Sequence, residues 1–162
     1  MRNRPIIAVC VVCMIVAAAS STGCSQTSAQ PTPPATETAA APSAMPSKAF
    51  HLSELEIRPS DTGEIRPLFR SPTATLDELE MHATTLNPGQ RPHPPHQHPY
   101  EELVVLREGT LEATVNDRVI ALSAGSVLFI APNDLHGWQN KGETPAKYFI
   151  ITWRTPRTAA AR

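Results

Sequence analysis

The sequence contains few cysteines and almost no excess of either charge. Its three cysteines are Cys10, Cys13 and Cys24, so residues 25–162 can form neither a disulfide nor a thiolate metal site. A metal site in that part would have to use histidine and carboxylate ligands. The formal net charge is −1 with neutral histidines, which argues against the strongly basic face of proteins that neutralise many phosphates. We therefore expect no nucleic-acid partner.

Long apolar runs and phosphate-binding loops are also missing. The longest uncharged, largely apolar run, residues 6–19, has 14 residues and is shorter than the roughly 20 that a membrane-spanning helix needs. The sequence has no glycine-rich loop of the kind that cradles phosphates. From residue 48 onward no segment keeps an apolar period of about 3.6 residues, which argues against a helical domain.

The first 24 residues have the layout of a secretory signal. Arg2 and Arg4 give it a positive start, the apolar run follows, and small residues lead to Gly23 and Cys24. This ending resembles a bacterial lipobox, whose cysteine is lipidated after cleavage, although Ser21 stands where an aliphatic residue is usual. We expect an exported lipoprotein of the periplasm or cell envelope, held at the membrane by a lipid on Cys24. Ordinary cleaved export and an uncleaved anchor are the alternatives.

Residues 25–47 have the composition of a spacer. Nineteen of these 23 residues are Pro, Ala, Thr or Ser, and none is aromatic. Such a segment cannot bury enough apolar surface to offset the entropy that ordering would cost. We predict a disordered linker that its prolines make semi-extended.

Residues 48–162 are enough for one modest hydrophobic core. They contain short runs rich in Val, Ile, Leu and aromatic residues. These runs are separated by residues that favour turns, such as Gly, Pro and Asn. We expect strands at 79–86, 102–106, 111–115, 119–122, 126–130, 136–140 and 146–153. The three residues between 115 and 119 indicate a hairpin. The pattern predicts an all-β sandwich or barrel of antiparallel strands.

Three of the six histidines lie between His93 and His98, among prolines that hold the backbone extended. In extended chain, side chains two residues apart point to the same side, so His96 and His98 can converge on one ion. Glu102 would complete this face if a strand begins after Pro99. Two imidazoles and a carboxylate suit a transition metal such as Mn, Fe, Co, Ni, Cu or Zn better than calcium.

The same residues resemble the first motif of the cupin superfamily. That motif consists of His-X-His, three residues, Glu, six residues and Gly. His96, His98, Glu102 and Gly109 match each of these spacings. The glycine that opens the motif corresponds to Gly89, one residue further upstream than is usual.

The second cupin motif is similar to the segment that begins at Gly125. His136 and Asn140 stand in register with the histidine and asparagine of the motif. Ala131 replaces the usual proline, and Asn133 replaces a glycine. Asparagine can adopt the left-handed turn that glycine supplies there.

The resemblance covers about residues 76–153 and implies a single cupin jelly roll, a double-stranded β-helix barrel, within a domain of residues 48–162. It also implies that one divalent transition metal, such as Mn, Fe, Zn, Ni or Cu, binds inside the barrel. The implied ligands are His96, His98, Glu102 and His136.

Several other residues near the motifs are weaker candidates for the metal site or the pocket. Glu101 is the rival carboxylate, but it breaks both the spacing to Gly109 and the face that Glu102 shares with the histidines. We interpret His93 as a residue of the barrel rim. His82 lies on an expected strand and is a candidate for the pocket. Barrel packing is the expected role of Phe129, Trp138 and Tyr148.

Three kinds of function fit these features. A metal held by three imidazoles and a carboxylate keeps positions for water, oxygen or substrate, and the cupin fold serves oxygenases, isomerases, hydrolases, decarboxylases and binding proteins alike. The first hypothesis is a tethered metal-dependent oxygenase or isomerase that acts on a small molecule. The second is a non-catalytic binding or sensory module, and the third an envelope metal scavenger built on the Pro-His segment. The sequence itself does not indicate an oligomeric state, and the resemblance implies a homodimer because cupins commonly dimerise through barrel edges.

Overall fold

The computed structural model describes residues 43–160 of the chain. The predicted signal segment, residues 1–24, and residues 25–42 of the predicted linker lie outside the described residues. Within residues 43–160 no helix has the length and apolar character that crossing a membrane requires.

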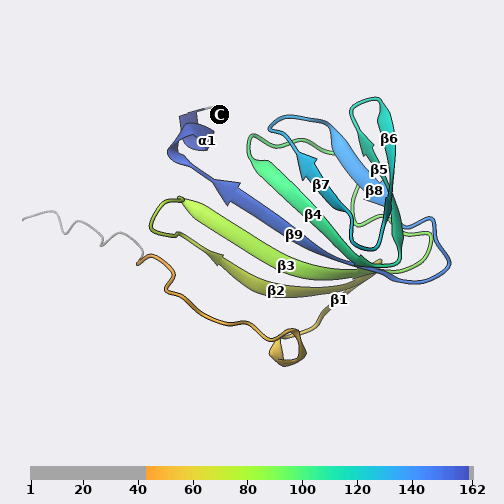
Figure 1. Ribbon diagram of the computed structural model, residues 1–162, viewed down its shortest axis with the longest axis horizontal. Coiled ribbons are helices and arrows are strands. Elements are labelled where there is room, and N and C mark those ends of the chain that lie inside the picture. The colour runs from red at the N-terminus through yellow and green to blue at the C-terminus, as the bar shows by residue number, and fades with distance from the viewer. Residues whose placement is uncertain (1–42, 161–162) are drawn as a thin grey trace, which may run out of the picture. The chain divides into compact units, whose positions relative to one another are not determined.

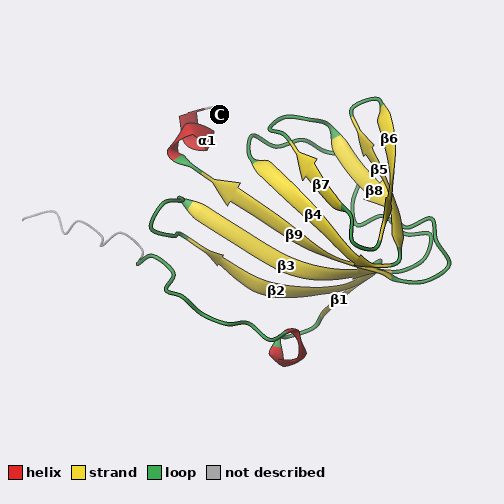
Figure 2. Cartoon of the chain, viewed as in Figure 1, coloured by secondary structure: helices red, strands yellow, loops and turns green. Residues whose placement is uncertain are grey.

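Strands make up most of the regular structure in this part, as the yellow arrows of Figure 2 show. In chain order the elements are η1 (Leu52–Glu54), β1 (Arg58–Ser60), β2 (Gly63–Ser71), β3 (Glu78–Leu86), β4 (Glu101–Glu108), β5 (Thr110–Val115), β6 (Arg118–Ser123), β7 (Val127–Ile130), β8 (His136–Gln139), β9 (Ala146–Arg154) and α1 (Pro156–Ala160).

The strands form two antiparallel sheets. The larger sheet has the order β1-β2-β3-β9-β4-β7, and the smaller sheet has the order β6-β5-β8. In Figure 1 the long strands β2, β3, β9 and β4 form one curved sheet, and β5, β6 and β8 lie together beside one end of it. The prediction of an all-β jelly roll is confirmed.

The expected strands correspond to β3 through β9, and the expected hairpin is β5–β6. It turns at Asn116, whose φ of 52° is in the left-handed region. Strands β1 and β2 were not predicted. Their sequences mix charged residues with Pro59 and Pro67, and the pairing of β2 with β3 shifts register between Pro67 and Phe69. A proline at a bulge obscures the alternation by which strands are recognised.

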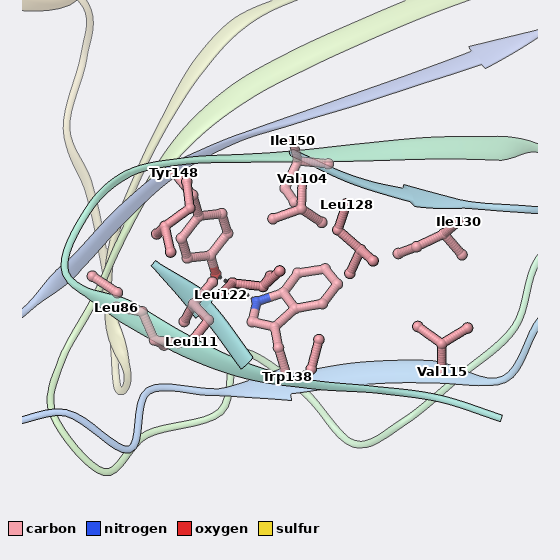
Figure 3. Packing of buried hydrophobic residues seen from close by; sticks show 13 residues of the cluster. Leu86, Val104, Leu111, Val115, Leu122, Leu128, Ile130, Trp138, Tyr148 and Ile150 are labelled. Atoms are coloured by element: carbon pink, nitrogen blue, oxygen red, sulfur yellow. Dashed lines mark hydrogen bonds between the residues drawn. The ribbon is translucent and has the colours of Figure 1, made fainter. Parts of the chain in front are cut away.

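The core lies between the inner faces of the two sheets. Figure 3 shows Val104, Tyr148 and Ile150 from the larger sheet pointing toward Leu111 and Trp138 from the smaller one. The Trp138 indole N–H donates a hydrogen bond of 3.0 Å to the Tyr148 hydroxyl, which gives the buried indole N–H an acceptor within the core. Burial raises the pKa of Tyr148 to about 12, so its phenol stays protonated at neutral pH.

Phe129 differs from the other two aromatic residues that were expected to pack in the barrel. Its neighbours Leu128 and Ile130 on β7 are buried, whereas Phe129 is 55% exposed. Successive side chains of a strand point to opposite faces, so a residue between two core residues must face outward. The prediction for Phe129 is therefore wrong, while Trp138 and Tyr148 are buried as expected.

Asn140, the last residue of the second motif, has a structural role. Its buried side-chain amide donates hydrogen bonds to the carbonyls of Leu86 at 3.0 Å and Thr144 at 2.8 Å. Its side-chain oxygen accepts a bond from the Gly142 N–H. These contacts connect the end of β3 to the loop that precedes β9. Asn133, with a φ of 65°, has the expected left-handed turn just before β8.

Candidate metal centre

His96 and His136 are neighbours although forty residues separate them in the chain. The His96 N–H donates to the His136 carbonyl at 2.9 Å, and the His136 N–H donates to the His96 carbonyl at 2.8 Å. This two-way antiparallel pair attaches the proline-rich loop before β4 to the first residue of β8. The backbone therefore fixes how close the two imidazoles lie.

Three imidazoles meet at this point. One ring nitrogen from each of His96, His98 and His136 lies within 4.8 Å of the other two. His98 and His136 are buried, with 8% and 1% of their surface exposed, and His96 is half-buried. Three nitrogen atoms at this spacing could hold one metal ion. The expected convergence of His96, His98 and His136 is thus present in the fold.

The outer nitrogens of two rings are held by the backbone. His98 Nδ1 lies 2.8 Å from the Tyr100 carbonyl oxygen, and His136 Nδ1 lies 2.8 Å from the Asp134 carbonyl oxygen. A carbonyl can only accept, so each Nδ1 carries the proton. The Nε2 atom of each ring then faces the centre of the cluster, where His98 Nε2 is within hydrogen-bonding distance of Glu102 Oε2, at 2.9 Å. Loss of the Nε2 proton gives the lone pair that a metal-binding histidine requires.

Glu102 is the carboxylate of the cluster. Its Oε2 lies 2.9 Å from His98 Nε2 and 3.7 Å from His136 Nε2, and its side chain is buried. Glu101, the rival carboxylate, pairs in register with Trp153 and points to the other face of β4. Strand alternation thus places Glu102, and not Glu101, beside the imidazoles.

The ionisable groups of the cluster shift one another's pKa values. Burial by itself would raise the pKa of Glu102, but contacts with His136 and His98 outweigh burial and hold this pKa below its ordinary value. Burial lowers the pKa of His136, yet Glu102 and the Asp134 carbonyl more than compensate, so the pKa is raised. For His96, burial and the neighbouring imidazoles lower the pKa. The carboxylate therefore favours positive charge beside it.

The residues present fit a divalent transition metal. His96 Nδ1 and His136 Nε2 are buried ring nitrogens without a hydrogen-bond partner among residues 43–160. An unpaired buried nitrogen is costly, and coordination of a metal would satisfy it. Imidazole nitrogen and carboxylate oxygen together are ligands of Mn, Fe, Ni, Cu and Zn. The imidazole and carboxylate donors and the two unpaired nitrogens are thus both consistent with a divalent transition metal.

A cavity of about 280 Å³ lies against three residues of this centre, His96, His98 and Glu102. His82, the pocket candidate, lines it, and so does His93, whose ring centroid lies 4.3 Å from that of His96. The remaining lining residues are Ser60, Thr62, Ile65, Glu80, Thr84, Pro92, Tyr100, Trp138, Tyr148, Ile150 and Thr152.

The sequence did not indicate most of the cavity wall. Ser60, Thr62 and Ile65 come from β1, β2 and the turn between them, which were not predicted as strands. Glu80 was missed as well, although it shares the face of His82 on the expected strand β3 and strand alternation could have indicated it.

Comparison with known proteins found a family model and solved structures that are similar to this chain. Residues 82–152 match the family model described as the cupin domain. No curated protein sequence matches the chain. The matched segment contains all four residues of the expected metal centre.

Three solved structures illustrate the structural similarity. An RmlC-like cupin from Shewanella frigidimarina has a TM-score of 0.55 and 19% identity, over 68% of this chain and 94% of that one. A predicted oxalate decarboxylase from Thermotoga maritima has a TM-score of 0.56 and 17% identity, over 66% of this chain and 99% of that one. A sugar phosphate isomerase from Silicibacter pomeroyi has a TM-score of 0.57 and 19% identity, over 67% of this chain and 77% of that one.

At these identities the likeness shows the fold alone. The sequence match over residues 82–152 and the two antiparallel sheets are both consistent with a cupin jelly roll. Residues 82–152 thus match the cupin domain model within an all-β fold that is similar to cupins of known structure, and three histidines of this segment lie close enough to hold a metal ion.

Proposed function

We propose that the domain binds one divalent transition metal through His96, His98, His136 and Glu102, and a small molecule in the adjoining cavity. The observation that carries the proposal is the direction of two imidazoles. The backbone carbonyls of Tyr100 and Asp134 hold the Nδ1 protons of His98 and His136, so both Nε2 atoms face the same space as the Glu102 carboxylate.

When bound, such a metal polarises a carbonyl, activates water or, if redox-active, binds dioxygen. The chain's own side chains define the ligand's surroundings. The ring of Tyr100 stacks on that of His98 with centroids 3.9 Å apart, and Trp138 and Ile150 form apolar parts of the wall. These groups exclude water from one side of the cavity and orient a ligand beside the metal centre. A small-molecule enzyme is the proposed class.

The names of the similar structures do not supply the substrate. Oxalate and a sugar phosphate, which two of the names mention, are anions. Among the described residues that line the cavity of this chain, none is a lysine or an arginine. Since one fold serves many reactions, the site itself has to indicate the ligand.

Replacing Glu102 by glutamine tests whether this carboxylate is a ligand. The substitution keeps the shape and removes the charge, so we expect a loss of zinc affinity of about 10- to 100-fold. Glu101→Gln removes the same charge from the adjacent residue on the opposite face, and we expect it to change the affinity less than about threefold. Zinc binding to the full chain is measured by competition with a chromophoric chelator. If the two substitutions lower the zinc affinity equally, Glu102 is not a ligand of the metal.

We also propose that the chain is exported and held at a membrane by a lipid on Cys24. The support is the sequence alone, since residues 1–24 have the charge, apolar run and small residues of a lipoprotein signal. The full chain produced in a bacterium should fractionate with membranes, and Cys24→Ala should move most of it to the soluble fraction. Cys13→Ala is the control. If Cys24→Ala leaves the distribution unchanged, the lipid anchor is wrong.

A further inference from the structure

One row of side chains crosses the floor of the cavity. Glu80 on β3 pairs with Thr152 on β9, and Thr152 pairs with Glu102 on β4. The three residues share the inner face of the sheet and all line the cavity. Neighbouring strands lie about 4.8 Å apart, so the backbones of Glu80 and Glu102 are two strand spacings, or roughly 10 Å, from each other. The cavity thus has an acidic residue at each end.

His82 accompanies Glu80 at the end away from the metal centre. It lies two residues further along β3, on the same face, and pairs in register with Ile150. Its Nδ1 is 3.8 Å from Glu80 Oε1, and both side chains are about one quarter exposed. Burial lowers the pKa of His82, although the charges of Glu80 and Glu102 act in the opposite direction. The imidazole is therefore a neutral group that can accept or donate a hydrogen bond.

Glu80 forms one long ion pair with an arginine. Arg70 Nη1 lies 3.8 Å from Glu80 Oε2, beyond hydrogen-bonding distance. The short contact of Arg70 is to Glu78, at 2.8 Å, and Glu78 also pairs with Arg154 at 2.6 Å. Arg70 and Arg154 thus make their short contacts with Glu78. Glu80 therefore lines the cavity with a carboxylate whose contact with Arg70 is longer than a hydrogen bond.

We propose that Glu80 and His82 form a subsite that binds an ammonium group or a hydrogen-bond donor of the ligand, while the other end of the ligand faces the metal centre. A carboxylate or phosphate in this subsite would meet Glu80 without a lysine or arginine among the described lining residues to compensate it. The inference rests on the proposed function, because the metal centre defines the opposite end of the cavity.

Three rigid pyridines with different groups at position 4 test the subsite. Each has the same ring nitrogen as a metal-binding head, and the distal group is an ammonium in 4-(aminomethyl)pyridine, an amide in isonicotinamide and a carboxylate in isonicotinate. Binding to the cobalt-loaded full chain is followed by the visible absorption of cobalt. We expect the ammonium compound to bind at least about tenfold more tightly than the carboxylate, with the amide between them.

Glu80→Gln is the decisive variant, because it keeps the size of the side chain and removes its charge. We expect it to reduce the ratio of the two affinities by about tenfold. Glu108→Gln, which removes a charge from the exposed end of β4, should leave the ratio unchanged. Thermal unfolding shows whether each variant is folded. A ratio near one in the unmodified chain, or the same ratio after Glu80→Gln, would overturn the subsite.

Failure of the metal site is distinguishable from failure of the subsite. The cobalt content of each sample is measured independently. In parallel, ligand-detected NMR ranks the same three compounds on the metal-free chain, where the subsite predicts the same order of affinities. If no cobalt is bound but the three compounds keep the expected order of affinities, the metal proposal is rejected and the subsite is supported. Bound cobalt without a charge preference would do the opposite.

Discussion

Replacing Gly109 by alanine is expected to destabilise the domain by about 3 kcal/mol. Gly109 has a φ of +78° and lies where the chain leaves β4 for β5. An added Cβ would lie 2.8 Å from the Pro145 carbonyl oxygen and 2.9 Å from the Ala146 Cα. Both are backbone atoms, so neither can move aside without shifting the start of β9.

Gly89→Ala is the matched control. Gly89 has nearly the same φ, +76°, but no atom lies within 4 Å of a Cβ added there. The two variants therefore share the cost of a left-handed alanine, about 1 kcal/mol, and only Gly109→Ala adds a clash. Urea unfolding of the two variants of the full chain measures the difference. If both substitutions lower the free energy of unfolding by the same amount, a steric clash with the start of β9 is not the reason that position 109 requires glycine.

Replacing His136 by alanine is expected to lower the zinc affinity of the chain by at least about 100-fold, and His98→Ala should act similarly. Each variant removes a buried nitrogen that faces Glu102. His93→Ala is the control, because the His93 ring contacts His96 but is not one of the three converging imidazoles. Its effect should stay below about threefold.

Competition with a chelator of known affinity gives these values, and circular dichroism reports whether each variant keeps its strands. The cluster would not be the zinc site if His93→Ala weakened binding as much as His136→Ala. Equal binding by all three variants would place the ion elsewhere in the chain.

The part of the site that the sequence predicted depends on local geometry. The spacing of His96 and His98 in extended chain, and the face of Glu102 once β4 begins, follow from the two-residue alternation of side chains. His136 was different. No local pattern connects it to the first two histidines, and only the resemblance to the cupins indicated it, because the bridge that joins it to His96 is a long-range backbone contact.

The far wall of the cavity could not be predicted for the same reason. Glu80 becomes part of the site only because β3 and β4 both pair with β9, which places Glu80 and Glu102 in one row. Pairing between distant strands is not encoded in a short window of sequence. Phe129 was a different kind of error, since the alternation of buried Leu128 and Ile130 already indicates that it points outward.

The central claim is that one metal ion binds to the histidine cluster. Metal analysis by mass spectrometry of the purified full chain, beside the variant in which His96, His98 and His136 are all alanine, tests it most directly. The account predicts one divalent transition metal ion per chain in the unmodified protein and less than about a tenth of an ion per chain in the triple variant. An undiminished metal content in a folded triple variant would contradict it.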